Sequence, residues 1–134
     1  MAIPSLLSDT IHPGMTGTST VTVTAADTAE AIGSGDVPVL ATPRVVALCE
    51  AASIVALAST LPAGLTSVGR RVQIDHLSPS TVGSEVVAEA TVEKVEGRRL
   101  IFTVSVNDGR GLVAAGRVTR VVVDREEFLA HAEG

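Results

Sequence analysis

The sequence predicts one long apolar helix that is followed by four β-rich runs, and this order admits few folds. The helix is expected from Thr42 to about Thr60, where the chain is rich in Ala and Leu and contains no glycine. Thr42 supplies a hydroxyl cap and Pro43 fits the first helical position, so the start of the helix is well marked. Because its residues are apolar on nearly all sides, we expect the helix to be buried.

Strands are expected on both sides of this helix, and tight turns join the later ones. Alternation of Val with Thr and Ser marks one strand at Thr18–Thr24. Glu96-Gly97 and Asn107-Asp108-Gly109 are typical of hairpin turns. Since the last four runs have no crossover helices between them, we expect an α+β fold in which an antiparallel sheet wraps round one long central helix. The four later strands are expected at Ser67–Leu77, Glu85–Val95, Leu100–Asn107 and Leu112–Val123.

A chain of 134 residues is expected to form one domain. Residues 1–17 contain two prolines and two glycines ahead of the first strand, and we expect them to form an irregular arm. Residues 18–134 then make up the single domain. Within it, glycines and a proline predict a loop at Ile32–Leu40, and Asp124–His131 is expected to form a short terminal helix.

Composition and charge exclude several classes of function. The net charge of -5 and an aromatic content of 1% make nucleic-acid binding a poor fit. Cys49 is the only cysteine, so an internal disulfide and a four-cysteine zinc site are both excluded, and a reducing cytoplasm is the simplest compartment. The first fifteen residues lack the pattern of a signal peptide. The longest apolar run, Val45–Ala58, falls short of the roughly 20 residues that span a bilayer.

Glu50 is a carboxylate in the middle of the apolar helix. A charged group among Val, Leu and Ala side chains pays a desolvation cost unless a partner compensates it. One interpretation is a general base or nucleophile in a cleft. The alternative is an exposed residue on a narrow polar stripe that it shares with Ser53.

His76 and Thr42 are two further polar residues in unexpected settings. Alternation places His76 on the same strand face as Val72 and Ile74, which is the face expected to turn toward the helix. A lone histidine there is more often a hydrogen-bonded core residue, but a meeting of His76 with Glu50 would give an acid–base pair. Capping explains Thr42 completely. Its hydroxyl also lies at a helix N-terminus, however, where N–H groups can hold a developing oxyanion.

The remaining polar candidates have simpler interpretations. Cys49 is interpreted as a small core residue, and His12 and His131 as solvated. The pairs Arg70-Arg71 and Arg98-Arg99 lie at strand ends, where such pairs usually solvate a surface. They also suit the phosphates of a nucleotide-bearing ligand.

Several motifs resemble those of a known family when they are taken in order. The stretch Val68–Pro79, followed by Val82-Gly83-Ser84, resembles the hot-dog thioesterases, and in particular the fluoroacetyl-CoA thioesterase-like group. Val95–Leu100 is similar to that group too, as is Ala41-Thr42-Pro43 before a helix that carries Glu50. The resemblance covers about residues 18–130.

The resemblance implies a hot-dog fold with five or six strands and a homodimer with sites at the subunit interface, while pairing of dimers into tetramers stays open. It implies hydrolysis of acyl-CoA thioesters with no cofactor beyond the coenzyme A of the substrate. The family's catalytic threonine, glutamate and histidine fall on Thr42, Glu50 and His76, and its glycine near the thioester falls on Gly69. With Gly69, the expected substrate-binding residues are Arg70, Arg71, Arg98 and Arg99.

One segment departs from that group. The fluoroacetyl-CoA enzyme closes its site with phenylalanines ahead of the helix, whereas residues 33–40 here read Gly-Ser-Gly-Asp-Val-Pro-Val-Leu. Because no aromatic side chain is present there, we expect a different or broader acyl-CoA substrate.

Two other functions fit a chain of this kind. One is a non-catalytic module that binds an acyl-CoA or acyl chain without cleaving it. The other is an acyl-CoA hydratase, since the same fold hosts that chemistry. Hydratases pair an aspartate with a histidine, but Asp75 and His76 are adjacent in a predicted strand and so face opposite ways.

Overall fold

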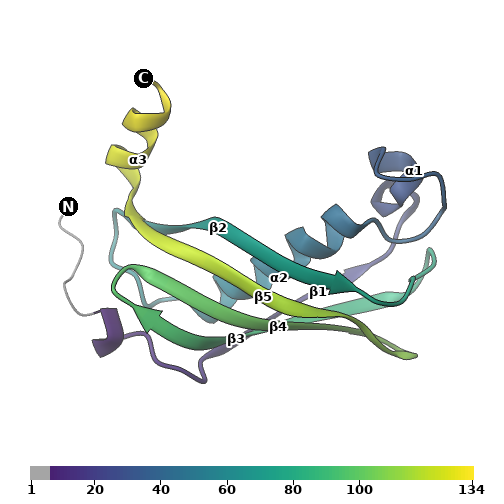
Figure 1. The fold of residues 1–134 in the computed structure, drawn as a ribbon, viewed down its shortest axis with the longest axis horizontal. Coiled ribbons are helices and arrows are strands. Elements are labelled where there is room, and N and C mark those ends of the chain that lie inside the picture. The colour runs from purple at the N-terminus through teal and green to yellow at the C-terminus, as the bar shows by residue number, and fades with distance from the viewer. Residues whose placement is uncertain (1–6) are drawn as a thin grey trace.

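The computed structural model describes residues 7–134, in which five strands form one antiparallel sheet curled around a helix (Figure 1). The strands lie in the order β1-β3-β4-β5-β2, so β1 and β2 are the two edges. Every neighbouring pair is antiparallel, which confirms the α+β architecture expected from the sequence. The strands are β1 (Thr16–Thr22), β2 (Leu65–His76), β3 (Glu85–Glu96), β4 (Arg99–Asp108) and β5 (Gly111–Asp124).

The central helix, α2 (Thr42–Ala56), ends four residues before its predicted end. The chain leaves it through a turn in which Ser59 adopts a left-handed φ of 67°. Two shorter helices flank the sheet: α1 (Ala29–Ile32), which the sequence did not predict, and α3 (Arg125–Ala132), which was expected. Single 3₁₀ turns occur at Leu7–Asp9 and Ala25–Asp27.

The predicted N-terminal arm is partly built into the domain. Leu7 and Ile11 are both buried in the core, and β1 starts at Thr16, two residues before the predicted strand. The described part of the arm therefore packs against the sheet instead of hanging free, and residues 1–6 of the predicted arm lie outside the described residues.

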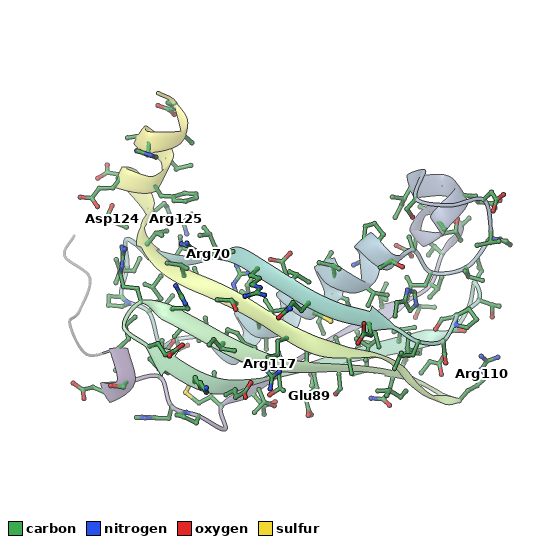
Figure 2. All side chains as sticks on the ribbon, viewed as in Figure 1. Arg70, Glu89, Arg110, Arg117, Asp124 and Arg125 are labelled. Atoms are coloured by element: carbon green, nitrogen blue, oxygen red, sulfur yellow. The ribbon has the colours of Figure 1, made fainter. Side chains whose placement is uncertain are left out.

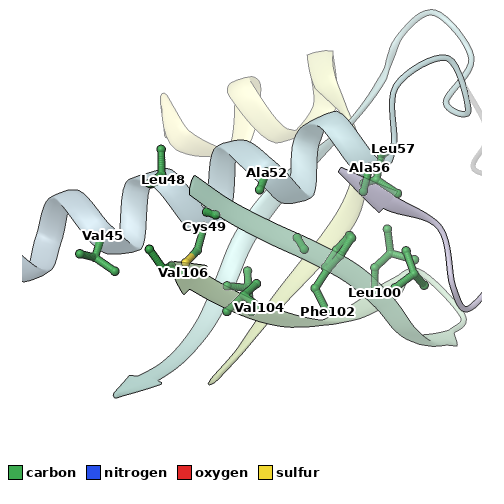
Figure 3. Packing of buried hydrophobic residues seen from close by; sticks show 14 of the residues in the cluster. Val45, Leu48, Cys49, Ala52, Ala56, Leu57, Leu100, Phe102, Val104 and Val106 are labelled. Carbon is green, nitrogen blue, oxygen red and sulfur yellow. The ribbon is translucent and has the colours of Figure 1, made fainter. Parts of the chain in front are cut away.

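The core fills the space between α2 and the sheet (Figure 3). Phe102 and Val104 of β4 point toward the helix face that carries Cys49 and Ala52, and all four side chains are buried. Small residues on this face let the helix approach the sheet closely. The aliphatic composition is therefore used to seat one helix inside a Val-rich sheet.

The helix α2 covers the part of the sheet near the β1 edge more fully than the part near the β2 edge. It packs chiefly on β1 and β3, where β3 alternates cleanly between buried and exposed residues. By contrast, most residues of β2 are exposed or half-buried along the whole strand. The polar residues of interest lie between α2 and this less covered part of the sheet.

Gly17 marks the closest approach between the sheet and the helix. A Cβ at this position would collide with backbone atoms of Ala52, Val55 and Ala56, which have no flexible end to move aside. Gly17→Ala is expected to lower the free energy of unfolding by about 3 kcal/mol, as severe overpacking does. Thermal unfolding followed by circular dichroism measures this. Gly109→Ala is the control, because a Cβ there meets nothing within 4 Å. Equal melting temperatures for the two variants would contradict the close contact.

Candidate active site

Thr42 and His76 meet at the N-terminal end of α2. The Thr42 hydroxyl lies 2.8 Å from His76 Nδ1, and the bond joins the start of the helix to the last residue of β2. The expected cap role of Thr42 is wrong, because Ala41 is the N-cap residue and makes no side-chain cap bond. Thr42 occupies the first helical position instead, so its hydroxyl is available to the histidine.

The other ring nitrogen of His76 is in an unusual position. Nε2 is buried and has no hydrogen-bond partner among the described residues. For Thr42 to donate its proton, Nδ1 must be the bare nitrogen, which leaves the hydrogen on Nε2. A buried polar nitrogen without a partner is costly in a purely structural role. In this tautomer Nδ1 accepts the hydrogen bond from the Thr42 hydroxyl.

Glu50 is bound by Arg120, a residue that the sequence analysis missed. Arg120 Nη1 donates to Glu50 Oε2 at 3.0 Å, while its Nε and Nη2 donate to the side chain and the carbonyl of Ser67. The side chain of Arg120 is 6% exposed and that of Glu50 is 33% exposed, so the cation of the pair is buried and the carboxylate is half-buried. Burial lowers the pKa of Arg120 and Glu50 opposes this shift, but a guanidinium stays charged in either case.

A signal for Arg120 is present in the sequence. On β5 the buried positions Val118, Arg120 and Val122 alternate with half-buried ones, which places a cation on the inward face of a Val-rich strand. Such a charge needs a buried partner, and Glu50 on the helix has the same need. The opposite charges of Arg120 and Glu50, each facing inward and each in need of a partner, indicate that the two residues pair. The alternative interpretation of Glu50 as part of an exposed polar stripe is wrong, because Ser53 is fully buried.

Gly69 lies directly against the carboxylate of Glu50. A Cβ at this position would collide with Glu50 Oε2, and Arg120 lies close by. The chain also bulges here, since the pairing of β2 with β5 shifts register between Gly69 and Arg71. The missing side chain thus leaves room for the Glu50 carboxylate, while the expected role of Gly69 in binding substrate stays a prediction.

The predicted catalytic residues therefore form two hydrogen-bonded groups on the side of α2 that faces β2 and β5. Thr42 bonds to His76 at one end, and Glu50 bonds to Arg120 beside Gly69 farther along α2. The hypothesis that Glu50 meets His76 directly gains no support, because no hydrogen bond or ion pair links them within residues 7–134. Thr42 and Glu50 are separated by eight residues, which is about 12 Å along a helix, so a substrate lying along α2 can reach both.

The arginine pairs lie apart from these groups. Arg70, Arg98 and Arg99 line one open hollow together with Glu96 and Val121. Since Arg120 and Val122 face the core, Val121 between them faces the outer surface of the sheet. Three of the four arginines are thus gathered at one place, and Figure 2 shows Arg70 at the α3 end of the molecule. Arg71 is exposed on β2 beside them. That they bind substrate stays a prediction.

The weaker candidates lie where the sequence suggested. Cys49 is buried, and burial raises the pKa of its thiol to about 11, with the charge of Glu50 adding to the effect. His12 and His131 are exposed. Asp75 is exposed on the strand face opposite to that of His76, which argues against a hydratase pair.

Residues 7–134 lack two further kinds of feature. No group of three or more His, Cys, Asp or Glu side chains is arranged to hold a metal ion. No helix in this part of the chain has the length and apolar character that crossing a membrane requires.

Comparison with known proteins gives consistent results. The model of a family described as fluoroacetyl-CoA-specific thioesterase matches residues 23–126. The fluoroacetyl-CoA thioesterase of Streptantibioticus cattleyicolor is 36% identical over 92 residues, which is 69% of this chain and 66% of that protein. The chain thus spans just under two thirds of the length of this curated relative.

Solved structures show the same likeness over more of the chain. A threonine-to-alanine variant of the fluoroacetyl-CoA thioesterase in complex with fluoroacetate superposes with a TM-score of 0.85 at 29% identity, covering 91% of this chain and 96% of that one. A hot-dog-like protein from Thermanaerovibrio acidaminovorans gives 0.86 at 25% identity, with coverages of 94% and 93%. A thioesterase superfamily member from Thermus thermophilus gives 0.85 at 28%, with coverages of 92% and 91%. These matches confirm the expected hot-dog fold.

Proposed function

The chain belongs to the fluoroacetyl-CoA-specific thioesterase family, and from this premise we propose that it hydrolyses an acyl-CoA thioester to the free acid and coenzyme A. The family consists of enzymes that cleave thioesters. The observation that carries the proposal is the hydrogen bond between Thr42 and His76, with the Glu50–Arg120 pair farther along α2. A hydroxyl held by a histidine is the arrangement that nucleophilic catalysis needs.

In the proposed reaction, Thr42 attacks the thioester carbonyl while His76 takes the hydroxyl proton. The thiolate of coenzyme A leaves and receives that proton, so an acyl-threonine ester remains. The positive end of α2 lies at Thr42 and favours the negative charge that develops on the carbonyl oxygen. Gly69 lies on the β2 side of the site, against the Glu50 carboxylate.

Glu50 then acts as the base for the second step. Its carboxylate takes a proton from a water molecule, and the resulting hydroxide attacks the ester. The bond between the acyl carbon and the Thr42 oxygen then breaks, the acid is released, and the Thr42 oxygen takes the proton back from Glu50. Arg120 holds the carboxylate at a fixed place and balances its charge. Glu50 as the nucleophile is the competing assignment. Mass spectrometry of the protein quenched during turnover separates the two, because the acyl group would be found on Thr42 in one case and on Glu50 in the other.

We further propose a homodimer, with the site at the subunit interface. The outward side of α2 exposes Ile54 and Val55, at 54% and 49%, and β2 is an edge strand of the sheet with Val72 exposed. An apolar helix face beside an open strand edge is a surface that a second copy would cover. Light scattering measures the solution mass, and a strict monomer would contradict this arrangement.

The coenzyme A portion is proposed to lie against Arg70, Arg71, Arg98 and Arg99, whose guanidinium groups suit its phosphates. We propose that no further cofactor is needed. The segment 33–40 has no aromatic side chain, which supports a substrate range other than fluoroacetyl-CoA alone. The single cysteine, buried as a free thiol, suits a reducing cytoplasm.

A panel of acyl-CoA esters with a thiol-trapping dye tests the proposal. Free coenzyme A should appear with at least one short acyl group, and the rate should fall in Glu50→Ala and His76→Ala. Full activity in both variants would refute the residue assignment. Tight binding of acyl-CoA without release of thiol would instead support a binding module.

Gly69→Ala tests the placement of Glu50 without removing its charge. The backbone at Gly69 suits any residue, and the new methyl group would displace only the end of the Glu50 side chain. We therefore expect the free energy of unfolding to change by less than about 1 kcal/mol, while kcat falls by about 10-fold or more. Steady-state kinetics and urea unfolding measure the two effects, with Gly109→Ala as the control. Unchanged kcat in Gly69→Ala would show that the position of this carboxylate does not matter.

A further inference from the structure

The two aromatic residues of the chain have opposite settings. Phe102 is fully buried in the core, whereas Phe128 is 43% exposed on α3, and its neighbour Leu129 is 52% exposed. The helix α3 has no buried residue at all. An exposed Phe-Leu pair on a terminal helix is a surface that needs a partner.

The helix α3 is well specified at its start but buries none of its residues. The Asp124 side chain accepts a hydrogen bond from the Glu127 N–H at 3.1 Å, and acidic residues occupy the first turn. Yet α3 has only 8 residues, and helices shorter than about 12 residues are marginal in water without packing. Figure 1 shows α3 standing away from the sheet, with Asp124 and Arg125 at its base (Figure 2).

A second exposed apolar patch lies at the other end of the molecule. Ile32 of α1 and Val37 of the segment 33–40 are 44% and 48% exposed. Figure 1 shows α1 and α3 rising on the same side of the molecule, the side of the β2 edge, at its two opposite ends. The two patches therefore border the same open edge.

In a dimer formed by antiparallel pairing of two β2 edges, the α3 end of one subunit lies beside the α1 end of the other. A two-fold axis near the middle of β2 brings the first residues of one β2 alongside the last residues of the other. The helix α3 follows Asp124, which pairs with Leu65 at the start of β2, and His76 is the end of β2. In such a dimer the α3 of one subunit meets the α1 end of the other subunit, where Thr42 and His76 lie.

We propose that Phe128 of one subunit packs on the segment 33–40 of the other and forms the aromatic wall of its acyl site. This inference rests on the interfacial site of the proposed function. The segment 33–40 is held beside the site, since Leu40 N–H donates to the Ser80 carbonyl and Val39 bridges to Thr81 just beyond His76. It contains no aromatic side chain of its own. Phe128 supplies one in trans, and together with Leu129 it selects an apolar acyl chain.

A cross-linking experiment tests the docking without relying on activity. The double variant Val37→Cys/Phe128→Cys should form covalent dimers on mild oxidation, seen on a non-reducing gel, because Cys49 is buried and does not compete. Phe128→Cys alone and the pair Leu112→Cys/Phe128→Cys are the controls. Cross-linking in the test variant no faster than in the controls would overturn the proposal.

Mixed dimers purified through two different tags test the role in catalysis. When one chain carries Thr42→Ala and the other Phe128→Ala, the intact Thr42 site receives a natural Phe128 and should keep the KM of a wild-type site. When one chain is wild type and the other carries both changes, KM should rise by about 10-fold, the effect of losing one apolar wall. Glu126→Gln on the same helix is the control and should leave KM unchanged.

The outcomes distinguish a failure of the proposed thioesterase function from a failure of the proposed role of Phe128. Efficient cross-linking with no hydrolysis of any acyl-CoA would contradict the thioesterase function but support the docking of α3. An active wild-type dimer in which both mixed dimers share one KM, or a wild-type monomer, would overturn the role of Phe128. The opposite ranking of the two mixed dimers would place Phe128 in the site of its own subunit and overturn it as well.

Discussion

Thr42→Ala is expected to lower kcat/KM for the preferred acyl-CoA by about 100-fold or more, because it removes both the nucleophile and the partner of His76 Nδ1. His76→Ala should have an effect of similar size. The double variant should be little worse than either single variant, since residues that act as one unit give strongly non-additive losses. Initial rates of thiol release for the four proteins measure this.

Thr42→Ser serves as the matched control for this prediction. It keeps the hydroxyl that faces His76 and removes only a methyl group, so most of the activity should remain. Circular dichroism should show all of these variants folded, because Thr42 is exposed and makes no cap bond. Losses that simply add in the double variant would show that Thr42 and His76 act separately.

Arg120→Met is expected to be the most destabilising of the site substitutions. It leaves the Glu50 carboxylate without its counter-ion and takes two donors away from Ser67. Breaking a fully buried pair costs about 3–5 kcal/mol. Because Glu50 is 33% exposed and solvent screens it in part, we expect a loss of about 2 kcal/mol in the free energy of unfolding. Urea unfolding measures this loss.

The same strand supplies the control. Arg117 on β5 pairs with Glu93 at 2.9 Å through its Nε but is exposed, so Arg117→Met should cost less than about 1 kcal/mol. Adding Glu50→Gln to Arg120→Met should recover part of the stability, because a neutral amide needs no counter-ion, but no activity should return. Equal costs for the two arginine substitutions would contradict a structural role for the Glu50–Arg120 pair.

The order of elements was predictable because it depends on local patterns. Hairpin turns and Val-rich alternation predicted β3, β4 and β5 to within a few residues. The end of α2 was not predictable from composition, since Leu57–Thr60 contains no glycine or proline that would mark a helix end. The tertiary course of the chain decides that boundary. The short α1 was missed for a similar reason, as four residues carry too weak a pattern.

The candidate site was predictable only residue by residue. Glu50 and His76 stood out because each is polar among apolar neighbours, and such residues need a partner. Which partner each one takes depends on the register of β2 against β5 and on the approach of both to α2, and neither follows from local pattern. The sequence therefore did not predict Arg120 as a site residue. The interpretation of Thr42 as a helix cap also gave no indication of its hydrogen bond to His76.

The pairing of Glu50 with Arg120 also bears on how the reaction ends. Hydrolysis turns a neutral thioester into a carboxylate, which is attracted to any unbalanced cation near the site. Arg120, the buried cation of the site, is already neutralised by Glu50 and hydrogen-bonded to Ser67. The newly formed acid thus meets a negative neighbour and no vacant positive charge there, and we expect it to depart quickly and to inhibit only weakly.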